Sequence, residues 1–146
     1  MVKFEKILKY ADKDILYPKR STENSAGYDF FAPETVILPA KSLTRIMTGI
    51  KCELRPYMYL MLANRSSNPS KKNLFLANGV GIVDADYYNN SDNEGEIGFE
   101  FYNNSDEDIV IEKNEKIGQG IISRYIITED DNASGSRNGG FGSTGK

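Results

Sequence analysis

Apolar side chains in this chain recur at every second position over short segments, and this period constrains the fold more than any other feature. In residues 45–54, Ile46, Ile50, Cys52 and Leu54 all fall on one side. Successive side chains of a β-strand point to opposite faces, so this spacing predicts a strand with one buried face. We expect a chain built mainly from such strands.

Other segments repeat the pattern and are separated by turn residues. Further strands are predicted at residues 35–38, 57–62, 96–102, 109–111 and 117–128. The segment 57–62 is continuously apolar, as in a strand buried on both faces. Helix is expected only as one turn, with Asn68 as its cap and Pro69 as its first residue. Short strands at these intervals favour an all-β sandwich or barrel.

The dipeptide Asn78-Gly79 lies between two apolar runs, 74–77 and 80–83. Both central positions of a tight hairpin turn need a positive φ, which Asn and Gly accept most readily. We therefore expect the two runs to pair as a β-hairpin.

Composition narrows the class of protein. The 146 residues, 39% hydrophobic and 27% charged, are typical of one globular domain. Cys52 is the single cysteine and lies on the apolar face, so a core role is expected. No apolar run suits a membrane span or a signal peptide, so the sequence predicts a cytoplasmic protein without membrane contact.

The chain has no histidine. Ser-His and Cys-His catalysis and His-ligated zinc are thereby excluded, and a general base must be a carboxylate, a lysine, a tyrosine or a bound water. A metal would be a hard ion such as Mg²⁺. A net charge of −3 speaks against direct binding of nucleic acid, so any bound anion needs local positive charge.

The sequence changes character at Glu129, from where acidic residues give way to Asn, Ser and Gly with Phe141 as the only apolar residue. Such a segment buries too little surface to order itself, so we expect a folded domain at 1–128 and a flexible arm at 129–146. Its glycines admit an anion to the backbone, and Arg137 can grip a phosphate. A passive linker is the alternative. Residues 140–146 match the start of a P-loop, but the required Ser or Thr and helix do not follow, so the match is coincidental.

Two short polar groups follow or precede apolar strands. Arg65-Ser66-Ser67 comes directly after the run at 57–62, where a guanidinium and two hydroxyls suit a phosphate; a surface turn is the alternative. Asp29 could help to hold a magnesium ion, although an isolated acid more often caps a turn.

Asp84 and Asp86 close the second apolar run of the expected hairpin. A period of two places both carboxylates on one face, where their repulsion can raise the pKa of one and help it act as a general base. The alternative is a pair of solvated acids.

Five short motifs, taken together and in this order, resemble those of the trimeric deoxyuridine triphosphatase (dUTPase) family. They are Ala26-Gly27-Tyr28-Asp29, Arg65-Ser66-Ser67, residues 78–87, Lys116-Ile117-Gly118-Gln119 and residues 137–145. The resemblance implies an all-β fold, a dUTPase-like β-barrel or jelly roll of the β-clip type, with a flexible C-terminal arm. It also implies a homotrimer with shared active sites, in which the arm reaches a neighbouring subunit.

The activity that this resemblance implies is hydrolysis of dUTP to dUMP and pyrophosphate, which limits uracil in DNA and supplies dUMP for dTMP synthesis. Asp84 would activate the water that attacks the α-phosphorus, and Asp29 would order the Mg²⁺ shell through water. The residues implied to contact the substrate are Arg65, Ser66, Ser67, Asn78, Gly81, Val83, Tyr87, Gln119, Arg137, Phe141, Gly142, Ser143 and Thr144.

The resemblance divides these contacts among the parts of the substrate. Arg65, Ser66 and Gln119 would face the phosphates, and Arg137, Ser143 and Thr144 would hold the γ-phosphate. The side chain of Asn78 and the backbone of 79–81 would read the uracil edge. Tyr87 would pack under the sugar and leave no room for a 2′-hydroxyl, and Phe141 would cover the uracil.

The sequence departs from the family pattern in two places. After Tyr87 the usual Arg/Lys/Gln-Gly turn is replaced by Tyr88-Asn89-Asn90, and the polar stretch 91–96 lengthens a loop near the expected sugar site. Lys116 and Gly118 stand where the family usually has Arg and Ala. A lysine is a point charge and not a bidentate fork, so the resemblance assigns no role to Lys116.

Two other functions stay open from the sequence. One is a dCTP deaminase-type enzyme of the same fold, although Val83-Asp84 and the complete tail argue against it. The other is a non-catalytic, nucleotide-binding regulatory trimer, because fold alone does not dictate function.

Overall fold

The computed structural model describes residues 1–145, and Lys146, the last residue of the P-loop-like run, lies outside the described residues. The strands are β1 (Lys3–Lys6), β2 (Tyr28–Phe31), β3 (Val36–Leu38), β4 (Leu43–Met47), β5 (Ile50–Glu53), β6 (Met58–Asn64), β7 (Leu74–Leu76), β8 (Gly81–Asp84), β9 (Gly98–Asn103), β10 (Ile109–Ile111) and β11 (Lys116–Arg124). The helical turns are η1 (Leu8–Tyr10), α1 (Ser67–Lys72) and η2 (Ala85–Tyr87). The prediction of an all-β protein is confirmed.

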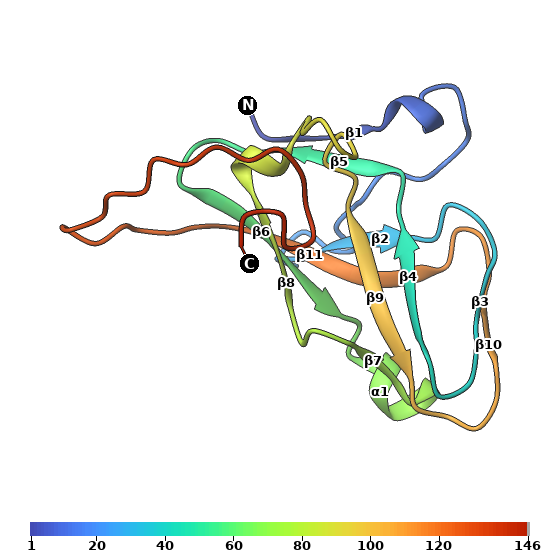
Figure 1. Ribbon diagram of the computed structural model, residues 1–146. Coiled ribbons are helices and arrows are strands. Elements are labelled where there is room, and N and C mark those ends of the chain that lie inside the picture. The colour runs from blue at the N-terminus through green and yellow to red at the C-terminus, as the bar shows by residue number, and fades with distance from the viewer. Residues whose placement is uncertain (146) are drawn as a thin grey trace.

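All strand pairs are antiparallel, and they form four sheets (Figure 1). The largest has the order β2-β11-β6-β8, and the second has the order β4-β9-β7. β1 pairs with β5, and β10 pairs with β3. Within residues 1–145 these ladders do not close into a barrel, so the jelly-roll form of the prediction holds and the barrel form does not.

The predicted strand at 45–54 is divided into β4 and β5, which belong to different sheets. The break lies at Gly49, whose φ of 73° suits glycine and which has no room for a side chain, since a Cβ there would lie 2.8 Å from the Tyr10 ring. The predicted buried face is nevertheless correct, because Ile46, Ile50 and Cys52 are almost fully buried. Burial raises the pKa of the Cys52 thiol to about 12, as befits a core residue.

The predicted hairpin around Asn78-Gly79 is wrong. β7 pairs with β9, whereas β8 pairs with β6 in another sheet. Of this dipeptide only Gly79 has a positive φ, 74°. Its amide donates to the carbonyl of Leu76 at 3.0 Å, and the amide of Val80 donates to that of Asn78 at 2.8 Å. The turn therefore connects two sheets, because each of the two runs pairs with a longer strand elsewhere in the chain.

Three phenylalanines connect the two larger sheets. Phe30 of β2 lies 5.3 Å from Phe99 of β9, and Phe99 stacks on Phe101 with ring centroids 6.3 Å apart. All three are buried, and each contributes roughly 1.5–3 kcal/mol relative to exposure to water. These contacts pack β2 of the largest sheet against β9 of the second sheet.

The continuously apolar sequence of β6 predicts burial of both faces, but only one face is buried within the chain. Leu60 and Leu62 are buried, but Tyr59 and Met61 on the other face are half-buried. Ile82 of the neighbouring β8 is 56% exposed on this same face, because it is paired with Met61. A strand can thus have the sequence of a fully buried strand when one of its faces is available to contact another molecule.

The helical turn α1 begins two residues earlier than predicted, with Ser66 as its cap. Pro69 is consequently its third residue, where an amide hydrogen would have no partner within the helix.

No helix among residues 1–145 is long and apolar enough to cross a membrane.

β11 ends at Arg124 and not at the predicted Thr128, and residues 125–145 contain no helix or strand. Figure 1 shows this segment leaving the sheets, doubling back and ending near β8. Three of its residues, Arg137, Gly139 and Gly140, are at least partly buried, so its last part lies against the domain.

Candidate functional site

A pocket of about 320 Å³ opens beside β8, with the C-terminal arm as one wall. Its lining residues are Leu62, Asn78, Gly81, Ile82, Val83, Asp84, Tyr87, Ile97, Gly98, Arg137, Phe141, Gly142 and Thr144. Nine of these were predicted from the sequence to bind a substrate or to catalyse. We call this cavity the Asp84 pocket.

Asp84 and Asp86 meet at one guanidinium. Nη2 of Arg137 lies 2.7 Å from Oδ2 of Asp84, and Nε lies 2.8 Å from Oδ1 of Asp86. The guanidinium is only 14% exposed, although the carboxylates are 50% and 59% exposed. The prediction that the carboxylates of Asp84 and Asp86 lie on one side is correct. The turn η2 places Asp86 there, because β8 has already ended at Asp84.

The turn before β8 contributes Asn78 and Gly81 to the lining of the pocket. Gly79 faces open space, since a Cβ there would meet nothing within 4 Å, but its amide and that of Val80 are already bonded within the turn. Gly81 lies across from Leu62, and a Cβ on it would press against that side chain at 3.2 Å. The polar side chain that this stretch brings to the pocket is therefore that of Asn78.

Phe141 of the arm lies over the pocket between two other side chains. Its ring packs edge-on against Tyr87 with centroids 6.4 Å apart, and the guanidinium carbon of Arg45 lies 4.0 Å from its centroid. Gly140 packs directly on the Tyr87 ring, because a Cβ at that position would overlap it. The arm is thus held by a cation–π contact and by aromatic packing.

A second group of predicted residues, which we call the Asp29 cluster, lies where β2, β11 and the end of β6 meet. Oδ2 of Asp29 lies 2.8 Å from Nζ of Lys116 and accepts a hydrogen bond of 2.5 Å from Ser21. Arg65 donates to the carbonyl of Lys116 at 3.2 Å. Gln119 is paired across the sheet with Asp29.

Electrostatics in the Asp29 cluster favours the carboxylate. Burial opposes ionisation of Asp29, but hydrogen bonds from Lys116 and Ser21 and the charges of Lys116 and Arg65 outweigh it, so its pKa lies below the usual range. Lys116 is therefore the ion-pair partner of Asp29.

Asp84 and Arg65 lie at opposite ends of β6. Asp84 is paired with Tyr59 on β6, and Arg65 follows the end of the same strand. Six residues of strand at about 3.3 Å each separate them by about 20 Å along the strand. Between these ends the two groups adjoin, since Leu62 lines the Asp84 pocket and Ala63 pairs with Gln119 of the Asp29 cluster.

Some residues at the pocket could not be found by motif. Arg45, Ile97 and Gly98 come from segments that look like ordinary strand sequence. Arg45 was recognisable only as a charge on the outward face of its strand. Conversely, Ser143 does not line the pocket although Thr144 does, and Ser66 and Ser67 lie at the start of α1.

Comparison with known proteins identifies the family. A family model described as dUTPase matches residues 13–145. A curated deoxyuridine 5′-triphosphate nucleotidohydrolase of Lactococcus lactis subsp. lactis (strain IL1403) is 46% identical over 144 residues, which cover 97% of this chain and 96% of that protein. The chain belongs to the dUTPase family.

Solved dUTPase structures share its fold. The crystal structure of the dUTPase from Streptococcus mutans is 40% identical, with a TM-score of 0.82, and the match covers 86% of this chain and 98% of that one. A Staphylococcus bacteriophage 80alpha dUTPase mutant, solved with dUpNHpp, has a TM-score of 0.74 over 100% of this chain and 99% of its own. At 23% identity this second likeness shows the fold alone.

The residues fit a magnesium ion only together with a ligand. No group of three or more acidic, histidine or cysteine side chains among residues 1–145 could hold a metal ion. Mg²⁺ commonly takes one or two carboxylates and completes its shell with water and phosphate oxygens. In this dUTPase-family chain Asp29, with its low pKa, is a hard oxygen donor of the right kind.

Proposed function

We propose that this protein hydrolyses dUTP to dUMP and pyrophosphate. Family membership over almost the whole chain supports the reaction. The observation that carries it to particular residues is the Asp84 pocket, where a carboxylate stands at the mouth of a cavity closed by an arginine-bearing arm. Removal of dUTP limits uracil in DNA, and the product dUMP serves the synthesis of dTMP.

Asp84 is the general base in this proposal. It takes a proton from the water that attacks the α-phosphorus, and a carboxylate is the natural choice in a chain without histidine. The attack forms the new P–O bond while the bond to the bridging oxygen breaks, and pyrophosphate leaves. Asn78 and the backbone at 79–81 read the uracil edge, and buried unpaired groups would penalise cytosine.

Arg137 has a second partner in this reaction. In the structure it binds Asp84 and Asp86, whereas the family resemblance assigns it, with Thr144 and Ser143, to the γ-phosphate. Its donors cannot serve both fully, so a bound triphosphate competes with the carboxylates for the guanidinium. This exchange frees Asp84 to accept a proton when the substrate is in place.

Magnesium would supply the remaining positive charge. The substrate brings several negative charges to a chain of net charge −3, and bound Mg²⁺ would neutralise charge that develops on the phosphates. Asp29 would orient the hydrated ion, while Arg65, Ser66, Ser67 and Gln119 contact the phosphates directly.

The complete active site forms between subunits of a homotrimer. The separation of about 20 Å along β6 supports this, since one triphosphate cannot contact Asp84 and Arg65 of the same chain. The partly exposed apolar face formed by Tyr59, Met61 and Ile82 is a suitable interface between copies, because large exposed apolar patches usually bind a partner.

Parallel assays with dUTP, UTP, dCTP and dTTP test the function. Pyrophosphate release is measured with and without Mg²⁺, and ammonia release is measured with dCTP. We expect pyrophosphate from dUTP alone among these substrates, and only with Mg²⁺. Ammonia from dCTP would identify a deaminase, and tight nucleotide binding without any product would identify a regulatory protein.

A further inference from the structure

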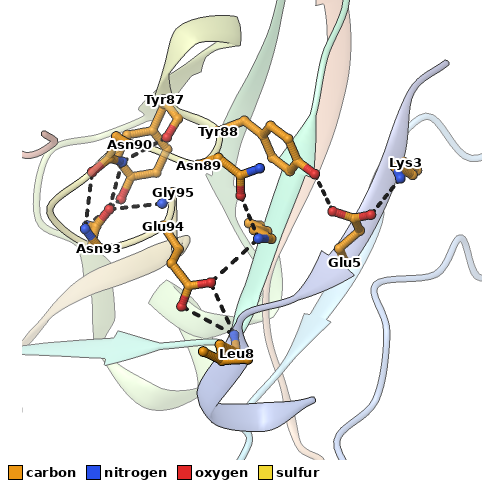
Figure 2. A network of polar contacts seen from close by, with 11 residues as sticks. Lys3, Glu5, Leu8, Tyr87, Tyr88, Asn89, Asn90, Asn93, Glu94 and Gly95 are labelled. Carbon is orange, nitrogen blue, oxygen red and sulfur yellow. Dashed lines mark hydrogen bonds and ion pairs between the residues drawn. The ribbon is translucent and has the colours of Figure 1, made fainter. Parts of the chain in front are cut away.

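The loop that follows Tyr87, residues 88–96, is held in one conformation by its own side chains (Figure 2). Three of its residues, Asn89, Glu94 and Gly95, have positive φ angles of 56°, 61° and 85°. A Cβ at Gly95 would lie 2.6 Å from the carbonyl oxygen of Tyr87, so this position requires glycine. The loop therefore folds back tightly on the residue that precedes it.

The hydroxyl group of Tyr87 is fastened by this loop. It donates a hydrogen bond of 2.6 Å to the carbonyl of Glu96 and accepts one of 2.9 Å from Nδ2 of Asn93. Burial raises the pKa of Tyr87, so the hydroxyl keeps the proton that it donates. Figure 2 shows Asn93 and Asn90 together beside the ring.

Asn90 holds Asn93 in turn. Its amide group donates to the carbonyl of Tyr87 and to Oδ1 of Asn93, both at 2.8 Å. Its oxygen accepts from the backbone amides of Asp92 and Asn93 at 3.0 and 3.1 Å. Both donors and both acceptor sites of this buried side chain are used, which makes a rigid network.

The loop is also fixed to the N-terminal part of the domain. The Glu94 carboxylate accepts from the amide of Leu8 at 3.2 Å, and Lys51 donates to Asn89 at 2.6 Å. The hydroxyl of Tyr88 binds the carboxylate of Glu5. These contacts anchor both sides of the loop to β1, η1 and β5, so the network around Tyr87 rests on a rigid base.

The rest of the Tyr87 ring faces the pocket and the arm. Tyr87 lines the Asp84 pocket, and Gly140 and Phe141 pack against it. A ring that is fixed at its hydroxyl end presents a wall in a constant position to whatever enters. A ring anchored only at Cα could rotate and yield to an extra oxygen atom on the sugar.

We propose that Asn93, held by Asn90, is a positioning residue that fixes the Tyr87 ring and thereby sets the preference for deoxyribonucleotides over ribonucleotides. The inference rests on the proposed function, in which Tyr87 packs under the sugar. It adds that the hydrogen bonds of the Tyr87 hydroxyl, and not the ring alone, are needed to exclude the 2′-hydroxyl of a ribonucleotide. The Asn-rich loop that departs from the family pattern is the device that supplies this anchor.

Steady-state hydrolysis of dUTP and UTP by the full chain tests this inference. Asn93→Ala removes one of the two hydrogen bonds of the Tyr87 hydroxyl, and Tyr87→Phe removes both but keeps the ring. Each should lower the ratio of kcat/KM for dUTP over UTP, by up to about tenfold, as is typical for a small steric change in a pocket. The double variant should lose no more than Tyr87→Phe alone, since Tyr87→Phe already removes the hydrogen bond from Asn93.

Matched variants separate the possible failures. Asn104→Ala, in a loop remote from Tyr87, should keep the wild-type ratio, and melting temperatures show whether each variant is folded. Tyr87→Ala should abolish most of the preference. If it does so while Tyr87→Phe and Asn93→Ala keep the full preference, the positioning role is refuted although the function stands. If Tyr87→Ala also keeps it, the sugar role of Tyr87 is refuted as well.

Discussion

The charges of single side chains decide where chemistry can occur on this molecule. Arg137 forms ion pairs with two carboxylates in the Asp84 pocket, and Lys116 forms one in the Asp29 cluster. A polyanionic substrate that binds these cations must therefore rearrange at least one of the ion pairs.

Asp84→Asn should keep dUTP binding and lose turnover by about 10²–10⁴-fold, the usual contribution of a general base. The amide preserves the shape of the carboxylate but cannot take the proton of the attacking water. Pyrophosphate release gives the rate, and calorimetry with dUTP gives the affinity. Asp86→Asn is the matched control, since it contacts the same guanidinium and should lose far less. A fully active Asp84→Asn protein would remove this residue as the base.

Lys116→Met should make stability less dependent on acid pH. The pKa of Asp29 is lower in the folded chain than in the unfolded chain, so its contribution is present above the unfolded pKa and disappears as pH falls through the folded pKa. The pair is partly exposed, so the loss at pH 7 should be no more than about 1 kcal/mol. Urea unfolding at pH 7 and at pH 3 measures it. A loss of equal size at both pH values would contradict an electrostatic cause.

At the scale of strands and turns, close packing decides which residue can stand at position 118. Gly118 lies on β11 directly under the Phe99 ring, and a Cβ there would lie 2.7 Å from Cδ1 of Phe99 and 3.1 Å from the carbonyl of Ala63. The position of the Phe99 ring therefore depends on a glycine at position 118.

Gly118→Ala should destabilise the fold by about 1–3 kcal/mol, the usual cost of overpacking a core. Phe99→Leu added to it should recover part of this loss, because the smaller side chain makes room for the methyl group. Chemical denaturation of both single variants and the double variant measures the coupling. Strictly additive losses would show that the close approach has no energetic consequence.

At the scale of the whole molecule, the C-terminal arm forms part of the Asp84 pocket. The twelve residues 125–136 have no helix or strand and could span up to about 40 Å when extended. In the single chain the arm lies over its own Asp84. The family resemblance predicts that in the trimer it serves a neighbouring subunit, and that exchange stays a prediction.

A mixed-trimer experiment tests this exchange. A chain ending at residue 136 and the full chain with Asp84→Asn should each form folded trimers with greatly reduced activity. Co-refolded, they should regain a measurable part of the wild-type rate, because an arm from one chain then meets Asp84 of another. Separately refolded samples mixed afterwards are the control. No recovery would show that each arm closes its own chain's pocket, and full activity in the truncated chain would refute the role of the arm.

Much of this protein follows from its sequence alone. The period of two identified several strands and the buried face of residues 45–54, because side-chain direction in a strand is a local property. β1 and β2 were not predicted. The motifs also named most residues that line the Asp84 pocket, since the chemistry of a triphosphate limits the side chains that can serve it. The lack of histidine limited a general base to a carboxylate, a lysine, a tyrosine or a bound water before any geometry was known.

Tertiary structure decided which strands pair and which motifs meet. Asn78-Gly79 has the local signature of a hairpin, yet its flanking runs joined different sheets, because packing with distant strands outweighs the preference of a turn. The same competition separated Asp84 from Arg65 and brought Arg45 to Phe141 and Asn93 to Tyr87. Residues distant in sequence meet only when the core closes, and a local pattern carries no record of that contact.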